Sequence, residues 1–488
     1  MLYLIIISIY LLILIGLGIY KARSIKTQDD FSVAGRTLTP WVLVGTMLAT
    51  WIGTGSILGN AGKTYEIGIA ALMLPIGGVL GIFILTRIAG KVRTYEKFTV
   101  PEILGDRFGS EARILSVFAL VMAYMVIVSY QFNAGGAVLH TVLTDTSGEH
   151  LISVQTGTII AAIFIIAYTM LAGLVSVAYT DVGNGIIMTA SLLISFPILW
   201  IKAGGWSGME VAFSNMGNPE KMDFFGQYSL MDIINFCLPS FLLVLGDANM
   251  YQRFFASKDA ESAKKATTFL VGFVLIIELL IIASAWVSSS MIIDVENGRH
   301  VLIYAAHQLL PPILGAIMMT TIIGIIISTA DSFLLVPATT LIRDIYLKYF
   351  NKNVSDKKIV LLSRLLVLVL GIIAYVVSIG FSKSSSFFER ALYAYTIYGA
   401  AITPVLVAAL FWKKASKVGA IISIISGTIT TLIWKEFSII KLIIPGNIYN
   451  TMDEVLPAIS ISLLGLIIGS LLFPDKNDPI VVSNSDMI

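Results

Sequence analysis

The chain has 488 residues, of which 57% are hydrophobic and 13% are charged, and its formal net charge is +2. Soluble domains usually carry roughly 25% charged residues, so about half of the usual charge is absent. A net charge so close to zero creates no field that would recruit a polyanion such as a nucleic acid. The single cysteine, Cys237, excludes an internal disulfide framework. The composition is typical of a polytopic membrane protein and argues against a cytosolic enzyme or a secreted disulfide-rich scaffold.

Apolar stretches of about 20 residues, each long enough to cross a bilayer of about 30 Å, recur along the whole chain. The polar stretches between them, of which 203–229 and 435–454 are the longest, are too short for a separate soluble domain, which needs about 40 residues. The sequence therefore predicts an all-α integral membrane protein, a single domain over 1–488. We count thirteen spans, at approximately 2–20, 40–62, 67–90, 112–143, 153–174, 181–202, 230–252, 266–291, 308–342, 359–382, 387–412, 417–434 and 455–473.

Basic residues are unevenly divided between alternate loops. The loop at 21–39 and every second loop after it carry 24 of the 32 Lys and Arg residues, and the remaining loops carry 8. Because cytoplasmic loops are enriched in Lys and Arg, we expect the N-terminus outside and the C-terminus in the cytoplasm, with the chain in the plasma or inner membrane. Residues 1–20 lack a basic leading segment and a small-residue cleavage site, so we interpret them as a retained span.

Two of the spans are interrupted by glycines and polar residues at mid-depth. Residues 49–56 read ATWIGTGS, and residues 246–250 read GDANM. Unwound backbone within a membrane is tolerated only where it faces protein or a watery cavity. If spans 2–6 and 7–11 form two five-helix units, both interruptions lie on the first helix of a unit, which in transporters indicates a midplane binding site. Glycines that only permit close helix packing are the alternative.

This division predicts four parts within the single domain, and an odd number of helices per unit inverts the second unit. They are an extra N-terminal span with its cytoplasmic loop (1–37), a first repeat (38–202), an inverted second repeat (229–412), and two extra spans with a tail (413–488).

Three acids in or at the ends of the apolar spans qualify as functional candidates. An ionisable group within a membrane is functional by default, because it is costly to keep there. Asp181 opens the sixth span, where a helix N-cap near the interface is an equally good explanation. Asp331 lies within the ninth span, where hydration from the cytoplasmic side is the alternative. Asp247 lies in the interruption of the seventh span and is the hardest of the three to explain structurally.

Hydroxyl side chains cluster beside Asp331. Ser328 and Ser332 are four residues apart and share one helical face, with Thr329 next to them. Hard cations such as sodium prefer oxygen ligands, and carbonyls freed by the interrupted second span can complete such a site. Hydroxyls that only bond to the carbonyl four residues earlier are the alternative. Three hydroxyls within five positions of an acid favour the ion site.

Several motifs together resemble the sodium:solute symporters, a family with the broken-helix, five-plus-five inverted-repeat fold of the leucine-transporter type. They are DFSVAGR at 30–36, GLVSVAYTD at 173–181, YQR at 251–253, STADS at 328–332 and RDIY at 343–346. The resemblance covers nearly the whole chain.

The resemblance implies a principal sodium site between the second and ninth spans. Backbone carbonyls of Ala49, Ile52 and Ile325 and the hydroxyls of Ser328 and Thr329 match the family's ligands.

Some members of the family add a second sodium site below the first. In this chain Asp181, Ser328 and Ser332 match it, as a possible second sodium or proton site. Asp331 stands where such members carry a serine, which leaves the number of ions open.

The solute is less defined by the sequence. Some motifs are nearest to the choline-transporter branch, and a quaternary ammonium needs aromatic faces, of which Trp51 supplies one. Asp247 can instead pair with the ammonium of an amino acid or amine. The candidate substrate-binding residues are Trp51, Gly53, Thr54, Asp247 and Asn249.

The sequence therefore predicts a secondary symporter in the lipid bilayer that couples sodium entry to import of a small polar organic solute by alternating access. The solute classes are an amino acid, an amine or choline-like compound, or a carboxylate. No cofactor beyond sodium, no nucleic acid and no oligomer is required. A proton carried by Asp181 or Asp331 is an alternative driving ion. A membrane-embedded sensor or channel is the alternative from another class, and an enzyme is disfavoured because no nucleophile–base pair or metal motif is present.

Overall fold

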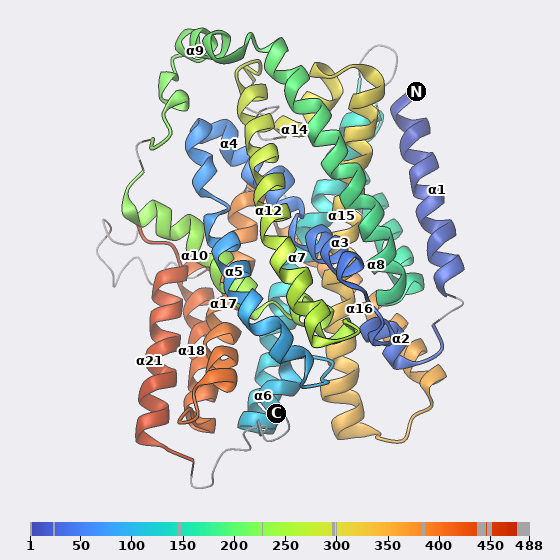
Figure 1. The fold of residues 1–488 in the computed structure, drawn as a ribbon, viewed down its shortest axis with the longest axis vertical. Coiled ribbons are helices and arrows are strands. Elements are labelled where there is room, and N and C mark those ends of the chain that lie inside the picture. Colours follow the sequence, from blue (N-terminus) through green and yellow to red (C-terminus); the bar gives the residue numbers. More distant parts are fainter. Residues whose placement is uncertain are drawn as a thin grey trace.

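The computed structural model describes residues 2–22, 25–143, 149–226, 228–294, 298, 300–381, 386–436, 446 and 451–475. Over these residues the chain is a bundle of long helices, most of which run along one axis, while α9 lies across one end (Figure 1). Because every backbone polar group in a bilayer needs an internal partner, a helical bundle is one of the two architectures that can span it. The prediction of an all-α polytopic membrane protein is confirmed.

The first half of the chain contains the following elements: α1 (Leu2–Ala22), α2 (Gln28–Val33), η1 (Ala34–Arg36), α3 (Pro40–Trp51), η2 (Gly55–Asn60), α4 (Ala61–Ile67), η3 (Gly68–Met73), α5 (Ile76–Arg93), α6 (Val100–Phe108), α7 (Ser110–Val142), α8 (Val154–Lys202), α9 (Gly205–Asn215) and η4 (Pro219–Met222). The second half contains α10 (Leu230–Gly246), α11 (Ala248–Ala256), α12 (Ala260–Ser289), α14 (Val301–Tyr304), η5 (Ala305–Leu309), α15 (Pro312–Thr340), η6 (Leu341–Phe350), α16 (Asp356–Phe381), α17 (Phe387–Phe411), α18 (Lys417–Glu436) and α21 (Val455–Leu472).

The expected count of thirteen spans is not confirmed. Among the described residues, ten helices are long and apolar enough to cross a membrane, or eleven if the bent pair formed by α3 and the segment from η2 to η3 counts as one span. Helix α5 falls outside that count because its 18 residues include Arg87, Lys91 and Arg93. Two expected spans, 153–174 and 181–202, both lie on the single element α8, which has 49 residues.

Helix α8 folds back on itself at Gly173. This glycine has φ 58° and ψ 171°, a conformation that side chains with a Cβ rarely adopt. The Tyr168 hydroxyl donates to Thr180 Oγ1 across 3.4 Å, whereas residues twelve apart on a straight helix are separated by about 18 Å. Residues 154–172, the first limb, therefore lie beside residues 174–202, the second limb. The expected loop at 175–180 is helical instead.

Helix α15 lies at the centre of the bundle and contacts both α7 and α8. Of its spanning stretch 83% is buried inside the protein, against 17% for α1 at the periphery. Large apolar side chains on the outer helices face outward, as a lipid-exposed surface requires. Examples that are more than half exposed are Leu12, Phe83, Ile163, Val376 and Leu471.

Candidate functional site

The second expected span is broken as the sequence predicted. Helix α3 ends at Trp51, Ile52 leaves the helical region with ψ 84°, and the segment that begins at Gly55 is bent from α3 by 48°. Gly53 lies against α15 so closely that a Cβ there would be 2.9 Å from Thr329 Oγ1. Only glycine permits this approach, which places the freed backbone of the break beside the hydroxyl cluster of α15.

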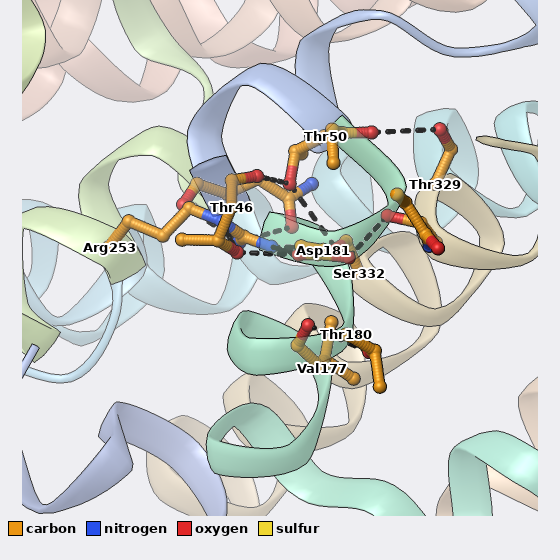
Figure 2. Close-up of polar contacts among 12 residues, drawn as sticks. Thr46, Thr50, Val177, Thr180, Asp181, Arg253, Thr329 and Ser332 are labelled. Carbon is orange, nitrogen blue, oxygen red and sulfur yellow. Dashed lines mark hydrogen bonds and ion pairs between the residues drawn. The ribbon is translucent and has the colours of Figure 1, made fainter. Parts of the chain in front are cut away.

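Two of the expected principal sodium ligands, Thr329 and Ala49, meet at this contact. Thr329 Oγ1 donates to the Ala49 carbonyl across 3.4 Å, and Ile52 and Ser328 are both buried nearby on the same two elements, with Ile325 one turn earlier on α15. Figure 2 shows Thr329 pointing from α15 toward the end of α3. The contact joins one expected carbonyl and one expected hydroxyl from two helices that are far apart in sequence.

Asp181 is completely buried and lies within the second limb of α8, eight residues beyond Gly173. Its Oδ2 accepts a hydrogen bond of 2.6 Å from Thr46, and its Oδ1 accepts one from Ser328. The alternative of an interfacial helix N-cap is therefore wrong. Asp181 instead links α8 to α3 through Thr46 and to α15 through Ser328, which is one of the expected sodium ligands.

Arg253 places a buried positive charge in the same cluster (Figure 2). Its Nη2 lies 3.9 Å from Asp181 Oδ2 and donates to Ser332 Oγ across 2.6 Å. Its Nε donates to Thr46 Oγ1 across 3.2 Å, and its Nη1 donates to the Asn249 carbonyl across 3.3 Å. The motif at 251–253 carried no assigned role in the sequence. In the structure its arginine supplies the counter-charge of Asp181.

Asp331 belongs to a separate contact of α15. Its carboxylate accepts a hydrogen bond from Thr169 of the first limb of α8, and it is 1% exposed. Hydration from the cytoplasmic side therefore does not explain it. Among the described residues no lysine or arginine pairs with Asp331, whereas Arg253 pairs with Asp181.

A pocket lies between the two broken helices. The expected residues Trp51, Gly53 and Asp247 line it, whereas Thr54 and Asn249 are directed elsewhere. Thr54 donates to Gln131 Oε1, and the Asn249 side chain faces Arg253. The lining residues are Thr50, Trp51, Gly53, Gly55, Tyr130, Gln131, Leu243, Asp247, Thr329, Phe333 and Tyr395.

Asp247 forms the break between α10 and α11, with φ −57° and ψ 111°. Its Oδ1 accepts hydrogen bonds from the Tyr124 hydroxyl at 2.5 Å and from the Asn249 amide at 3.1 Å, so it caps the first turn of α11. The Tyr398 hydroxyl donates to the freed carbonyl of Gly246 across 2.7 Å. Two buried tyrosines therefore satisfy the polar groups that the second break exposes.

Most of the aromatic and polar wall of the pocket was not predicted from the sequence. Tyr130 and Gln131 are adjacent polar residues in the middle of an otherwise apolar span, a signal that was available. Gln131 Nε2 is buried and has no hydrogen-bond partner among the residues that the structure describes. Native proteins seldom leave such a donor unpaired, and this donor lies on the wall of a pocket. Phe333 and Tyr395 carry no comparable sequence signal.

Comparison with known proteins identifies the family. The model of the sodium:solute symporter family matches residues 31–427 of this chain. The chain belongs to this family. Its members are transporters, so the protein is a polytopic membrane transporter and not an enzyme. The resemblance inferred from the motifs is confirmed.

Curated relatives align over almost their entire length. The high-affinity proline transporter PutP of Bacillus subtilis is 27% identical over 474 residues, covering 94% of this chain and 96% of that protein. The sodium/proline symporter of Escherichia coli is 25% identical over 473 residues, covering 94% and 92%. These relatives transport proline, and they lend no support to the resemblance with choline transporters.

Two solved structures share the fold. A Na⁺-coupled sialic acid symporter in a substrate-bound outward-open state superposes with a TM-score of 0.80 at 17% identity, covering 98% of this chain and 99% of that one. MhsT in complex with L-phenylalanine superposes with a TM-score of 0.56 at 12% identity, covering 88% and 97%. At these identities the likeness concerns the fold.

Proposed function

We propose that this symporter couples sodium entry to import of a small zwitterionic amino acid, with proline as the first solute to test. The observation that carries the proposal is the contact between Thr329 and the Ala49 carbonyl. Thr329 belongs both to the ligand set for sodium and to the wall of the solute pocket. An ion bound here holds the break in α3 against α15, and the same contact shapes the pocket.

Sodium is bound by the carbonyls of Ala49, Ile52 and Ile325 and the hydroxyls of Ser328 and Thr329. Five neutral oxygens suit a hard monovalent cation (by extension from). The Ser328 hydroxyl donates a hydrogen bond to Asp181, and a hydroxyl that donates keeps lone pairs free to accept. Its oxygen is therefore oriented to bind a cation.

We infer that Asp181 is held as an anion by Arg253 rather than by a second sodium ion. The Arg253 guanidinium lies 3.9 Å from the Asp181 carboxylate and donates to Ser332. Arg253 therefore interacts with two of the three residues of the possible second site. This arrangement supports one sodium ion per solute in the conformation described.

The pocket offers complementary groups for a zwitterion with an apolar ring. The unpartnered Gln131 Nε2 is a donor for a carboxylate, and Asp247 supplies negative charge for a secondary or primary ammonium. Trp51, Phe333 and Tyr395 add aromatic surface, which suits both an apolar ring and a cation. The names of the curated relatives point to the same class of solute.

The orientation follows from the loops that carry most of the basic residues. Arg36 donates to the Phe255 carbonyl, Arg93 to that of Ser257 and Arg107 to that of Lys413. Four of the basic loops therefore meet at one end of the bundle, which supports a shared cytoplasmic side. We propose that the protein lies in the plasma membrane with its N-terminus outside and its C-terminus in the cytoplasm.

The test is uptake of radiolabelled proline into proteoliposomes that contain the purified protein. We expect accumulation above the external concentration under an inward sodium gradient, and none under a matched potassium gradient. Competition by unlabelled amino acids, choline, sugars and carboxylates identifies the solute class. Sodium flux that is independent of every solute would favour a channel and contradict the proposal.

A proton-coupled symporter is the second candidate, because Asp331 is buried and its described hydrogen-bond partner is the neutral Thr169. In that case a pH gradient without sodium drives solute accumulation. The same proteoliposomes distinguish the two driving ions.

A further inference from the structure

A further buried carboxylate, Glu278, lies outside the proposed ion and solute sites. It is in the middle of α12, a membrane-spanning helix, and it is 2% exposed. Its Oε1 accepts a hydrogen bond of 2.5 Å from Ser56, and its Oε2 accepts one of 3.1 Å from Asn60. Both partners are neutral. Among the described residues no lysine, arginine or histidine forms an ion pair with Glu278, whereas Asp181 has Arg253.

Glu278 lines a cavity of its own. Besides the carboxylate, the cavity has the hydroxyls of Ser56 and Ser240 and the amide of Asn60. Four aromatic side chains also line it: Trp51, Phe236, Phe388 and Tyr395. An acid, neutral oxygens and aromatic faces together suit a small cation.

The cavity adjoins the solute pocket. Trp51, Gly55 and Tyr395 line both spaces, so these residues form the partition between them. Asn60 immediately precedes α4 and Phe388 is the second residue of α17, so the cavity extends from the pocket away from the basic loops. In the proposed orientation this is the outer side.

We propose that Glu278, Ser56 and Asn60 form an outer capture site for a compact monovalent cation on its way to the central pocket. The cation is either sodium or the ammonium group of the incoming amino acid, since both carry a single positive charge that a buried carboxylate and neutral oxygens can hold. The inference rests on the proposed function, because it assumes that a cation and a solute enter from this side. A buried, uncompensated carboxylate is costly in a membrane, and a transient positive ligand removes that cost.

The experiment measures equilibrium binding to detergent-purified protein in two arms. The first arm titrates ²²Na⁺ without solute, and the second titrates radiolabelled proline at saturating sodium. The variant is Glu278→Gln, which keeps the shape and the partners of the side chain and removes its charge. The matched control is Glu66→Gln, a partly exposed acid of α4 that pairs with Lys63.

We expect Glu278→Gln to weaken binding about 10-fold or more in one arm, while Glu66→Gln leaves both arms unchanged. A loss in the sodium arm alone assigns the site to sodium, and a loss in the proline arm alone assigns it to the ammonium group. Wild-type affinities in both arms would show that Glu278 carries a proton in place of a cation, and this would overturn the inference.

If Glu278→Gln does not fold, Ser56→Ala removes one oxygen ligand and retains the acid. Several-fold weaker binding in one arm is then expected, and unchanged binding in both contradicts the inference. Ser328→Ala, measured in parallel, separates this result from the proposed function. If the wild type binds both ligands and only Ser328→Ala weakens sodium binding, the result contradicts the proposed outer site and supports the proposed central sodium site. A wild type that binds neither ligand overturns both.

Discussion

Arg253 and Asp181 form an ion pair in which neither side chain is exposed, with 3.9 Å between Nη2 and Oδ2. Arg253 follows the second helix break on α11, and Asp181 lies on the second limb of α8. The pair therefore ties the second broken helix to the helix beneath the sodium ligands. Because each charge is buried, each depends on the other for compensation.

Neutralising one member of this pair should destabilise the protein. We expect Arg253→Met to lower the free energy of unfolding by about 3–5 kcal/mol, since it leaves the Asp181 carboxylate buried and unpaired. The double variant Arg253→Met, Asp181→Asn should recover part of the loss, and thermal unfolding in detergent measures both. Lys417→Ala, which removes the exposed pair with Glu111, is the control and should change little. Additive effects of the two buried substitutions would contradict the pairing.

Removing one hydroxyl from the proposed sodium site should weaken sodium binding. We expect Ser328→Ala or Thr329→Ala to raise the sodium concentration for half-maximal uptake about 5- to 150-fold. This corresponds to about 1–3 kcal/mol for one lost ligand, by analogy with a hydrogen bond to a charged group. Thr320→Ala is the control, because Thr320 lies on the same helix and donates only to the Ala316 carbonyl. Unchanged sodium dependence in both variants would exclude the site.

The driving ion can be tested at the two buried aspartates. If Asp181 is a permanent anion, Asp181→Asn should weaken sodium dependence and leave some sodium-driven uptake. If Asp181 or Asp331 carries a proton, the asparagine variant cannot titrate, so gradient-driven accumulation should vanish while exchange of bound solute survives. The measurement is uptake under a pH gradient with sodium rigorously absent. Robust wild-type accumulation under these conditions, if it is abolished in either variant, would show that a proton and not sodium drives uptake.

Gln131 should determine affinity for the solute carboxylate. Gln131→Glu keeps an oxygen that can accept from Thr54 and replaces the unpartnered Nε2 with a second oxygen. Repulsion of the solute carboxylate should raise the KM for proline about 10-fold or more, which is about 1.4 kcal/mol. Sodium half-saturation at saturating proline should stay near that of the wild type. Gln308→Glu, at an exposed position, is the control, and an unchanged KM in Gln131→Glu would remove Gln131 from the solute site.

The turn at Gly173 should not tolerate a side chain. A Cβ there would lie 2.8 Å from Ile25 Cδ1 and 3.0 Å from Phe31 Cδ2, and φ is +58°. We expect Gly173→Ala to lower the free energy of unfolding by about 1–3 kcal/mol, the cost of holding a residue with a Cβ in a backbone conformation that essentially only glycine adopts. Gly183→Ala on the same helix meets nothing within 4 Å and should be neutral or slightly stabilising. Equal melting temperatures for the two variants would contradict the requirement for glycine at this turn.

The sequence by itself determined the features that depend on local composition and spacing. Long apolar stretches predicted a helical membrane protein because the bilayer accepts few other architectures. Glycines at 53 and 55 and the Asp247 segment predicted the two broken helices, and the spacing of Ser328, Thr329 and Ser332 on α15 predicted a shared polar face.

Only the tertiary structure decided which polar groups meet. The sequence placed Asp181 at the start of a span, where an interfacial helix N-cap explained it equally well, yet it is buried in a helix where Thr46 and Ser328 satisfy its oxygens. Arg253 pairs with Asp181, which is 72 residues away in the chain, and Glu278 accepts a hydrogen bond from Ser56, which is 222 residues away. The cost of burying each charge depends on those distant partners, which no local pattern of hydropathy or spacing contains.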